Sequence, residues 1–496
     1  MHSDHPLVRA LAFVHVAAQC GLLIYGAHRL LMLVHWLRRR EPSSAPLRPA
    51  SPKLRPSRVT VQLPIYNERF VAERLIDAAA ALRWPRGWFE IQVLDDSTDD
   101  TRSIVDRRAV HWRERGVEVT VLRREDRGGF KAGALAAGLR QARGEFIAIF
   151  DADFLPEPDF LERTMGPFAD PRVGMVQARW GFVNAEHSWL TRAQSVSLGA
   201  HFRIEHQVRY LRRLFFNFNG TAGVWRRNTI EDAGGWEPDT VTEDLDLSYR
   251  AQLAGWRFVY LDDVVVPSEL PVTLGALRAQ QRRWAKGSLQ TARKILPRVA
   301  RAQVAPRLKF EAAMHLLGNL GWLLGAVLLA TLYPAILFHT GRGWQELVAI
   351  DLPLVLGSTG TFLFYFICAA MVERGRQGWR TALLLPVLSV GMAPVVSMGL
   401  VEGAFARGGD FERTPKYGVR GRDRLPTRAA IYHRPRVGPL LLNAVLLLHA
   451  VVPVVLAVQS SAWAAVPPLL LIPVAFGAYL VQDLLELGRM RSSGTI

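Results

Sequence analysis

Cysteine is scarce in this sequence of 496 residues, which has two, Cys20 and Cys368, both inside apolar stretches. Neither a disulfide framework nor a zinc site can be built from them, and we expect both to be small packing residues. Acidic residues are also outnumbered, with 44 Asp and Glu against 61 Lys and Arg and a net charge of +17. Much of the Arg adjoins apolar stretches and forms no basic stripe with interleaved aromatics, which argues against a nucleic-acid partner and favours anionic membrane lipids.

Formal charge is absent from five long stretches of the chain. A membrane-spanning helix needs roughly 20 apolar residues, whereas the buried helices of soluble proteins give shorter runs. The last of the five stretches is long enough for two spans. The sequence therefore predicts an α-helical transmembrane bundle. The stretches are Ala10–His28, Ala312–Gly341, Leu352–Val372, Thr381–Val401 and Val437–Gln482.

The first stretch is flanked by Arg9 and Arg29 and lacks the small-residue cleavage site of a signal peptide. We predict that it is retained as an N-terminal anchor within residues 1–40. The cluster Arg38-Arg39-Arg40 follows it. By the positive-inside rule, this cluster places the next domain in the cytoplasm.

The fourth stretch does not fit a simple count of spans. If it crossed the bilayer, the loop over residues 404–436 would lie outside, although it holds nine Lys or Arg and three acidic residues. This contradicts the positive-inside rule, and we expect Pro386 and Pro394 to break the segment. We therefore predict an interfacial or re-entrant helix over residues 381–403 on the cytoplasmic side. One span then precedes the domain and four follow within residues 301–496, with the N-terminus outside and the C-terminal tail inside.

Residues 41–57 are rich in Pro, Ser and Arg and form a predicted linker. Over residues 58–300, β-type runs alternate with helical patterns, which predicts an α/β domain with a parallel sheet and crossover helices. The predicted strands are Val59–Leu63, Phe89–Leu94, Val117–Leu122 and Phe146–Phe150, and the predicted helices Glu68–Leu82, Asp100–Arg115 and Ala132–Ala142.

Two carboxylates, Asp151 and Asp153, follow the predicted strand Phe146–Phe150. Loops at this edge of an α/β sheet bind ligands, and Asp95 and Asp96 lie at the same edge after another strand. Carboxylates one residue apart can hold Mg²⁺ or Mn²⁺ together with a diphosphate and water, and we predict Asp153 as the main metal ligand, with Asp151 beside it. An isolated D-x-D is about as often a solvated turn.

Glu243 and Asp244 follow a Gly-rich turn and precede the helical pattern Leu245–Ala254. Helix capping would explain an acid at this place. We nevertheless predict Asp244 as a general base, because N–H groups at a helix start can hold its orientation and an acceptor hydroxyl needs a carboxylate within reach. Glu243 either orients substrate or faces solvent.

Gln280, Arg283 and Trp284 stand at positions i, i+3 and i+4 of a predicted helix and share one face. Arg283 can donate two hydrogen bonds to a diphosphate, and Trp284 offers a flat surface to a ligand ring. An interfacial membrane anchor is the alternative so close to Ala312. Lys131, in a Gly-rich run that opens a helix, meets phosphate or base unless the run is only a structural turn.

Taken together, seven motifs resemble family 2 of the glycosyltransferases. Within that family the resemblance is strongest to the processive, membrane-embedded synthases, above all the cellulose-synthase-like A and C proteins that make β-1,4-mannan, glucomannan or glucan backbones. The resemblance is dense from Val59 to about Leu296 and looser over the spans. The motifs are Val61–Glu68, Val93–Asp99, Lys131–Leu135, Phe150–Phe154, Val176–Trp180, Phe218–Trp225 and Gln280–Trp284.

This resemblance implies a nucleotide-sugar-binding fold of the GT-A type, an inverting single displacement and a channel formed by the spans. It assigns Asp153 to the metal and Asp244 to the base. Asp95 is grouped with the nucleotide by position only. The other implied roles are nucleotide binding for Tyr66, Glu68, Asp96, Lys131 and Asp151, diphosphate binding for Gln280 and Arg283, and acceptor binding for Trp284, Phe218, Asn219, Gly220 and Thr221.

A segment with Phe411, Arg413, Thr414, Pro415 and Lys416 resembles the gating loop of cellulose synthases. Arg413 stands where those enzymes usually have a small residue. The tail after residue 482 is too short for the cyclic-dinucleotide-binding domain of bacterial cellulose synthases, so we expect no regulation by that route.

Three hypotheses follow. The first is transfer of hexose from GDP-mannose or UDP-glucose to a growing β-linked polysaccharide that is then exported. The second is transfer of one sugar to a membrane lipid of the polyprenyl phosphate or ceramide type. The third, a transporter or inactive receptor, is opposed by the intact Asp153 and Asp244 and by spans that lack paired halves. The Arg- and Ala-rich composition predicts a bacterial plasma membrane, with a Golgi membrane as the alternative.

Overall fold

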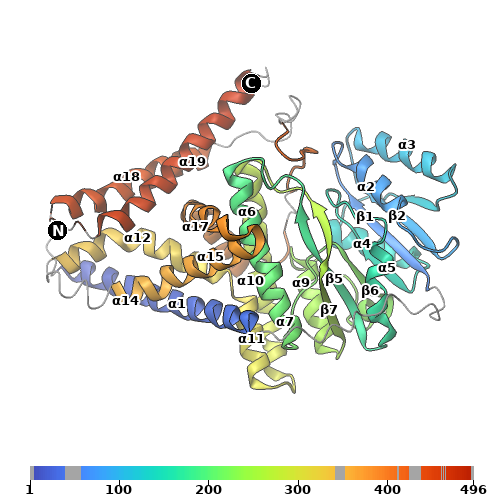
Figure 1. The fold of residues 1–496 in the computed structure, drawn as a ribbon, viewed down its shortest axis with the longest axis horizontal. Coiled ribbons are helices and arrows are strands. Elements are labelled where there is room, and N and C mark those ends of the chain that lie inside the picture. Colours follow the sequence, from blue (N-terminus) through green and yellow to red (C-terminus); the bar gives the residue numbers. More distant parts are fainter. Residues whose placement is uncertain are drawn as a thin grey trace.

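The computed structural model describes residues 5–38, 57–340, 352–409, 413–423 and 437–492, apart from 460, 462 and 464. A domain built on a β-sheet lies at one end of the molecule and long apolar helices lie at the other (Figure 1). Helices α6 (Trp189–Ala200) and α10 (Leu274–Arg301) run between the two regions.

The sheet has seven strands in the order β3-β2-β1-β4-β6-β5-β7. β3, β2, β1 and β4 are parallel, as the alternation of strands and helices predicted. β6 is antiparallel to both of its neighbours and β5 is parallel to β7, so the sheet is mixed in its second half, which the predicted strands did not cover. The strands are β1 (Val59–Ile65), β2 (Phe89–Asp95), β3 (Val119–Leu122), β4 (Phe146–Ile149), β5 (Val173–Phe182), β6 (Gly223–Arg226) and β7 (Arg257–Ser268).

Strand β1 lies in the middle of the sheet, and all of its residues except Pro64 are buried. Its β-branched and apolar side chains suit a strand that is covered on both faces. Helices α2 (Ala72–Ala80), α3 (Thr101–Arg113) and α4 (Phe130–Gln141) are the predicted crossover helices, with ends shifted by one to four residues. This half of the sheet therefore brings the carboxyl ends of β1, β2 and β4 to one edge.

The second half of the domain carries shorter helices around β5, β6 and β7. Helix α6 begins with a capping box at Ser188 and Thr191 and continues through one π-helical turn, η2 (His201–His206), into α7 (Gln207–Leu211). Such π-turns occur frequently at functional sites. The remaining helices are α5 (Phe160–Thr164), η1 (Gly166–Ala169), α8 (Arg227–Asp232) and α9 (Glu243–Leu253).

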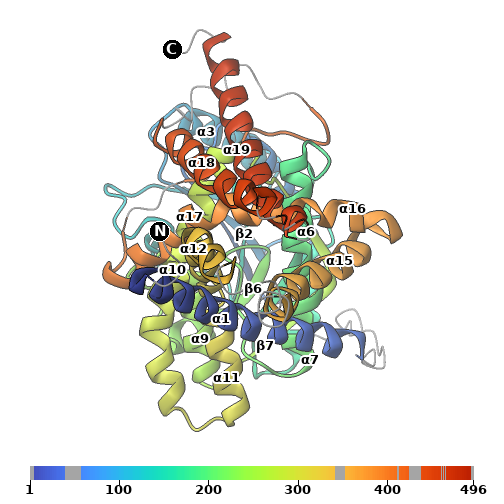
Figure 2. The same ribbon diagram turned by 90° about the vertical axis from the view of Figure 1, so that its left-hand side faces the viewer.

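Five helical segments in the described residues are long and apolar enough to cross a membrane, or six if the bent pair α11 (Pro306–Leu316) and α12 (Leu320–Thr340) is one span. That pair is bent by 54°, so the stretch predicted as one straight span over residues 312–341 begins in one helix and ends in another. In both views α18 (Val437–Gln459) and α19 (Val466–Ser492) lie above α11 (Figures 1 and 2). The other helices are α1 (Pro6–Leu37), α14 (Leu352–Val355), η4 (Leu356–Gly360), α15 (Thr361–Arg374), η5 (Arg376–Gly378), α16 (Trp379–Ala382), α17 (Leu384–Phe405), α18 (Val437–Gln459) and α19 (Val466–Ser492).

Helix α17 differs from its prediction in one respect. It runs unbroken through Pro394, and Pro386 lies in its first turn, where a missing N–H costs no hydrogen bond. The expected break is therefore wrong. α17 packs along α10, close enough that a Cβ on Gly399 or Gly403 would contact the backbone of α10 at Arg282 or Lys286. Half of the most apolar 18-residue stretch of the helical segment Arg376–Phe405, which includes α17, is buried inside the protein. Whether α17 crosses the bilayer or lies at its surface stays a prediction.

Candidate active site

A cavity of about 200 Å³ opens at the edge where the parallel strands end. α9, α10 and the segment 413–416 close it from the other side. Most of the candidate residues converge on it although they are far apart in the sequence. Those that line it are Tyr66, Glu68, Asp96, Lys131, Asp151, Asp153, Asn219, Gly220, Glu243, Asp244, Gln280, Arg283, Trp284, Arg413, Thr414 and Lys416.

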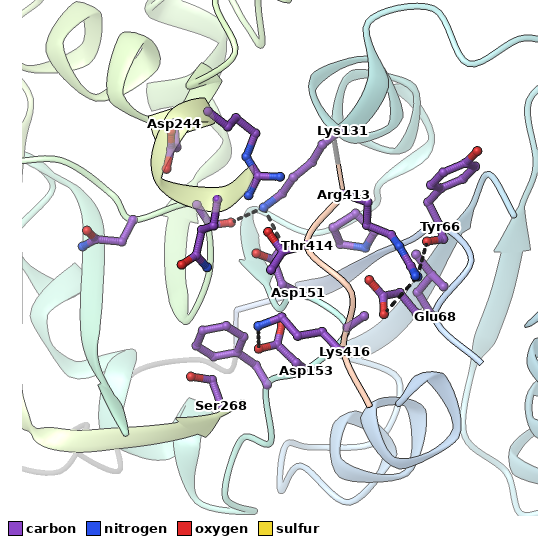
Figure 3. Close-up of a pocket in the computed structure, with 18 of the residues that line it drawn as sticks. Tyr66, Glu68, Lys131, Asp151, Asp153, Asp244, Ser268, Arg413, Thr414 and Lys416 are labelled. Carbon is purple, nitrogen blue, oxygen red and sulfur yellow. Dashed lines mark hydrogen bonds and ion pairs between the residues drawn. The ribbon is translucent and has the colours of Figure 1, made fainter. Parts of the chain in front are cut away.

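The two carboxylates after β4 each meet a lysine. Lys131 Nζ lies 2.5 Å from Asp151 Oδ1, and Lys416 Nζ lies 2.7 Å from Asp153 Oδ2 (Figure 3). The backbone N–H of Asp151 donates to Thr221 Oγ1 at 2.9 Å, and Asp153 Oδ2 accepts from the N–H of Glu269 at 3.2 Å. The backbone of the D-A-D turn is thus fixed, while its carboxylates are held by flexible ammonium groups.

This donor set fits a divalent cation. Asp151 and Asp153 supply hard carboxylate oxygens from one short turn at the cavity wall, the ligand type that Mg²⁺ and Mn²⁺ prefer. Their present partners are long, rotatable lysine side chains that can move away. Asp151 and Asp153 are therefore the residues that would hold the metal.

Asp244 lies in the first turn of α9, as predicted, and the N–H of Leu245 donates to its Oδ1 at 2.8 Å. Burial raises the pKa of Asp244, the nearby Glu243 adds to that rise and Lys131 opposes both, with a net pKa of about 7. Burial likewise raises the pKa of Glu243, with Lys131 again opposing. A carboxylate with a raised pKa that faces a cavity is suited to accept a proton near neutral pH.

The turn at Gly220 packs directly against Asp244. Gly220 has φ of +80°, and a Cβ placed on it would lie 3.0 Å from Asp244 Oδ2. Its carbonyl accepts from Lys131 Nζ at 2.9 Å. Lys131 therefore bridges this turn and Asp151, and glycine is required both by the backbone conformation and by the close approach.

Gln280, Arg283 and Trp284 lie on one face of α10 and all line the cavity, as their spacing predicted. All three are partly exposed. The positive charge of Arg283 lies close enough to Glu243 to lower the pKa of that carboxyl. The face of α10 thus brings a guanidinium and an indole to the side of the cavity that holds Asp244.

Two arginines that the sequence gave no role lie at the opposite end. Arg124 donates to Asp96 with Nε at 3.0 Å and Nη2 at 2.5 Å. The guanidinium of Arg127 lies 3.3 Å from the centre of the Tyr66 ring. Both follow β3, which ends beside β2, so the signal was a pair of cations at the ligand-binding edge of the sheet.

Residues 413–421, which we call the strap, cross the cavity. Arg413 Nη1 lies 3.3 Å from Glu68 Oε2 and donates to the carbonyl of Tyr66 at 3.4 Å. Burial raises the pKa of Glu68 to about 8, although Arg413 lowers it. Arg413, which departs from the usual gating-loop pattern, thus meets the side of the cavity that Tyr66 and Glu68 line.

Glu269 anchors the strap. Its carboxylate accepts from the N–H groups of Tyr417 and Gly418, at 2.8 and 2.9 Å, and from Arg74 at 3.0 Å. Only 2% of Glu269 is exposed. The sequence signal that could have found it was a lone acid in the apolar run after β7.

Several candidate residues do not line the cavity. Asp95 is buried and pairs with Arg123 at 2.9 Å. Phe218 is buried against Trp225. Thr221 is buried and supports Asp151, and Pro415 is absent from the cavity wall. Phe411 lies outside the described residues.

A second acidic group lies outside the cavity. Oxygens of Glu237, Asp239 and Asp246 lie within 4.8 Å of one another. Lys294 Nζ contacts all three, at 2.5, 2.8 and 3.0 Å. Lys294 therefore balances the negative charge of the three carboxylates. We interpret this cluster as a structural ion-pair network.

Comparison with known proteins agrees with this geometry. Residues 56–287 match the family described as glycosyltransferase like family 2. Glucomannan 4-beta-mannosyltransferase 7 of Arabidopsis thaliana is 47% identical over 251 residues, which are 49% of this chain and 45% of the relative. Glucomannan 4-beta-mannosyltransferase 1 of Cyamopsis tetragonoloba is 43% identical over 290 residues, 56% of this chain and 55% of the relative. The matches thus span about half the length of these curated relatives.

Among solved structures, a mannosyltransferase from Pyrobaculum calidifontis, in complex with GDP-Man and Mn²⁺, superposes with a TM-score of 0.50 at 26% identity. The superposition covers 73% of this chain and 98% of that protein. The likeness therefore extends beyond the sheet domain.

Proposed function

The domain over residues 56–287 belongs to glycosyltransferase-like family 2, and from that premise we propose that this chain is a membrane-embedded, inverting glycosyltransferase that extends a β-linked polysaccharide. One observation carries the proposal. A partly buried carboxylate, Asp244, faces the same cavity as the D-A-D turn and the Gln280–Trp284 face. Sugar transfer from a nucleotide requires a carboxylate that accepts a proton, a turn that can bind a cation and a helix that can bind a diphosphate.

We propose GDP-mannose as the donor, with UDP-glucose as the alternative. The plant relatives are named for mannosyl transfer to glucomannan, and the archaeal mannosyltransferase was solved with GDP-Man. Tyr66, Asp96 and Arg127 would surround the nucleobase of the donor. Lys131 and Arg283 would meet the diphosphate with charge-assisted hydrogen bonds.

Asp153 and Asp151 would hold Mn²⁺ or Mg²⁺, as their donor set allows. A bound divalent cation neutralises charge on the departing diphosphate. Lys416 and Lys131, freed from these carboxylates, would then turn toward the phosphate oxygens. Both positive side chains would thus stay in the site and change partners.

Asp244 would take the proton from the acceptor hydroxyl. The hydroxyl oxygen forms its bond to the anomeric carbon as the bond from that carbon to the diphosphate oxygen breaks, which inverts the configuration. The Leu245 N–H and the Gly220 turn hold Asp244 in place for this step. Positioning of this kind lowers the barrier because the reacting groups meet already aligned.

We further propose that the spans carry the product out of the cell. Among the helices that could cross a membrane, α15 and α17 pack against α6, and α17 and α19 pack against α10; α6 and α10 both border the cavity. The composition favours the plasma membrane of a bacterium, with the catalytic domain in the cytoplasm.

The test is a product assay with purified protein in lipid nanodiscs, given radiolabelled GDP-mannose or UDP-glucose with Mn²⁺. We expect a polymer that endo-β-1,4-mannanase or endo-β-1,4-glucanase degrades, according to the donor. Asp244→Asn should lose turnover by about 10³-fold and still bind GDP, because it removes only the base. A product that stops at a single sugar on a lipid would refute the polysaccharide assignment.

A further inference from the structure

The end of strand β5 differs from the rest of that strand. Residues Val173–Ala178 are buried, whereas the last four residues are partly exposed. The register with β7 shifts between Ala178 and Arg179. Such irregularities re-aim side chains and are frequent beside active sites. Beyond the shift, β5 and β7 continue as a two-stranded ribbon that forms one wall of the cavity.

Two aromatic side chains, Trp180 and Phe182, project from this ribbon into the cavity wall. They are two residues apart on a strand and therefore share a face. Trp180 is braced by Phe154 and Phe202, with ring centres 5.1 and 5.2 Å away. Neither Trp180 nor Phe182 carries charge, so neither is suited to bind a diphosphate or a metal.

A chain of contacts connects this wall to the end of the cavity that holds the base. Phe202 packs against His201 and His206, with ring centres 5.1 and 5.5 Å away. The side chain of Asn219 lies 3.1 Å from His201 Nε2 and 2.9 Å from His206 Nε2. The next residue, Gly220, packs against Asp244. Trp180, which lines the same cavity as Asp244, is therefore connected through packed side chains to the turn beside Asp244.

The nucleotide end lies on the other side. Phe182 pairs with Ser268, and in Figure 3 Ser268 lies across the cavity from Tyr66 and Glu68. Leu198 of α6 completes the apolar wall. α6 in turn packs against α15 and α17, so this wall stands between the cavity and the apolar helices.

We propose that Trp180 and Phe182 form an acceptor subsite that binds a hexopyranose ring of the growing glycan, beyond the unit that faces Asp244. This inference rests on the proposed function and names where its acceptor binds. The C–H face of a pyranose ring packs well on a flat aromatic surface, and the polar rim of the sugar can reach the Asn219 amide. Two aromatic rings on one strand can bind any hexose unit of the glycan, whatever its place in the glycan chain. This suits an acceptor that must advance by one unit per cycle.

Binding of mannohexaose and of cellohexaose to the full-length protein in nanodiscs, measured by calorimetry with GDP and Mn²⁺ present, tests this subsite. We expect Phe182→Ala and Trp180→Ala each to weaken binding of the preferred hexasaccharide about tenfold, as loss of an aromatic contact does, with the Kd for GDP unchanged. Trp88→Ala is the matched control, because Trp88 is 41% exposed and does not line the cavity. Trp180→Phe serves if Trp180→Ala does not fold, and it should restore part of the affinity.

Unchanged hexasaccharide affinity in Phe182→Ala and in the Trp180 variants would overturn the subsite. A weaker Kd for GDP with unchanged hexasaccharide binding would overturn it as well, since the residues would then serve the donor. Failure of the unmodified protein to bind any nucleoside diphosphate would instead count against the proposed function.

Discussion

At the scale of single residues, the site is a set of partly or fully buried charges that neutralise one another in pairs. Lys131 meets Asp151, Lys416 meets Asp153, and Arg413 meets Glu68. Asp244 differs, because the charged neighbour that affects it most is a second carboxyl, Glu243, which raises its pKa. A carboxyl in that setting keeps its proton to a higher pH than an ordinary aspartate.

Activity should therefore depend on pH near neutrality. Asp244 acts as base only when ionised, and burial raises its pKa to about 7, so kcat/KM should rise with pH through that region and fall about tenfold per unit below it. A pH-rate profile at saturating Mn²⁺ measures this. A profile that stays flat down to pH 5 would remove Asp244 as the base. The Kd for GDP, followed over the same range, separates this effect from donor binding.

Gly220 offers a second test. In Gly220→Ala the new Cβ would meet Asp244 Oδ2 at 3.0 Å and the backbone would be strained at φ of +80°. We expect kcat to fall about 10- to 100-fold, the loss typical of a displaced catalytic group. Gly235→Ala is the control, because Gly235 has φ of +79° but nothing within 4 Å of its Cβ position. Equal losses in both variants would show that backbone strain alone is responsible.

Lys416 should compete with the metal. It lies on Asp153, so a cation that binds there must displace it. Without donor, Lys416→Met should bind Mn²⁺ about fivefold more tightly, since the ion pair that the metal must break is worth about 1 kcal/mol. Electron paramagnetic resonance titration measures free Mn²⁺ directly. Lys309→Met, remote from the cavity, should leave the affinity unchanged, and an unchanged value in Lys416→Met would separate the strap from the metal site.

At the scale of elements, α10 is held from both sides. Its cavity face carries Gln280, Arg283 and Trp284. Arg278, which does not line the cavity, donates to Asp483 of α19 at 2.7 and 3.0 Å, and Asn443 of α18 donates to the same carboxylate at 2.9 Å. The helix that lines the active site is thus tied to the two C-terminal helices by a buried ion pair.

Removing one partner of that pair should be costly. Asp483→Leu leaves the Arg278 charge buried and unpaired, which we expect to destabilise the protein by about 3 to 5 kcal/mol. The double variant Arg278→Met, Asp483→Leu should recover most of this loss. Thermal unfolding in detergent micelles measures both. Glu402→Gln is the control, because Glu402 pairs with Arg282 at a partly exposed site and should cost less than 1 kcal/mol.

The pattern of apolar residues correctly predicted the helices and strands that depend on local sequence. It did not predict features that depend on packing between distant segments. β1, β2, β4 and the helices between them follow from apolar runs and crossover rules. The antiparallel direction of β6 does not, because its partners β4 and β5 are set by the whole domain. Pro394 also misled, since the tight packing of α17 on α10 sustains a helix through it.

The candidate site was predictable where side chains act from fixed spacings. Gln280, Arg283 and Trp284 share a helix face by arithmetic alone. The sequence did not predict the roles of Arg124, Arg127 and Glu269, because their partners are distant in sequence. The sequence around an isolated charged residue does not show which groups it will contact. Asp95 was grouped with the nucleotide because it adjoins Asp96, but alternate residues of a strand point to opposite faces.

At the scale of the whole molecule, the open question is which helices cross the bilayer. The predicted topology leaves α17 on the cytoplasmic side, with the strap inside and the turn between α18 and α19 outside. If α17 crossed, both would change sides. Length and composition allow either arrangement, since α17 lies within one of the candidate spans.

Cysteine labelling decides between the two arrangements. In a background with Cys20 and Cys368 replaced by Ser, we expect Ser461→Cys to react with a membrane-impermeant maleimide on intact cells. Arg422→Cys should react only after permeabilisation. The reverse pattern would show that α17 spans the membrane and would place the strap on the side away from the cytoplasm.

The strap has a consequence for timing. It crosses the cavity and holds Asp153 and Glu68 through Lys416 and Arg413, so in this arrangement a donor enters only after those contacts open. In the proposed synthase, each added sugar would include one opening and one closing of the strap, and the polymer would grow no faster than the strap moves. The speed of elongation would then be set in part by a peptide segment between two apolar helices, far along the chain from Asp244, the proposed base.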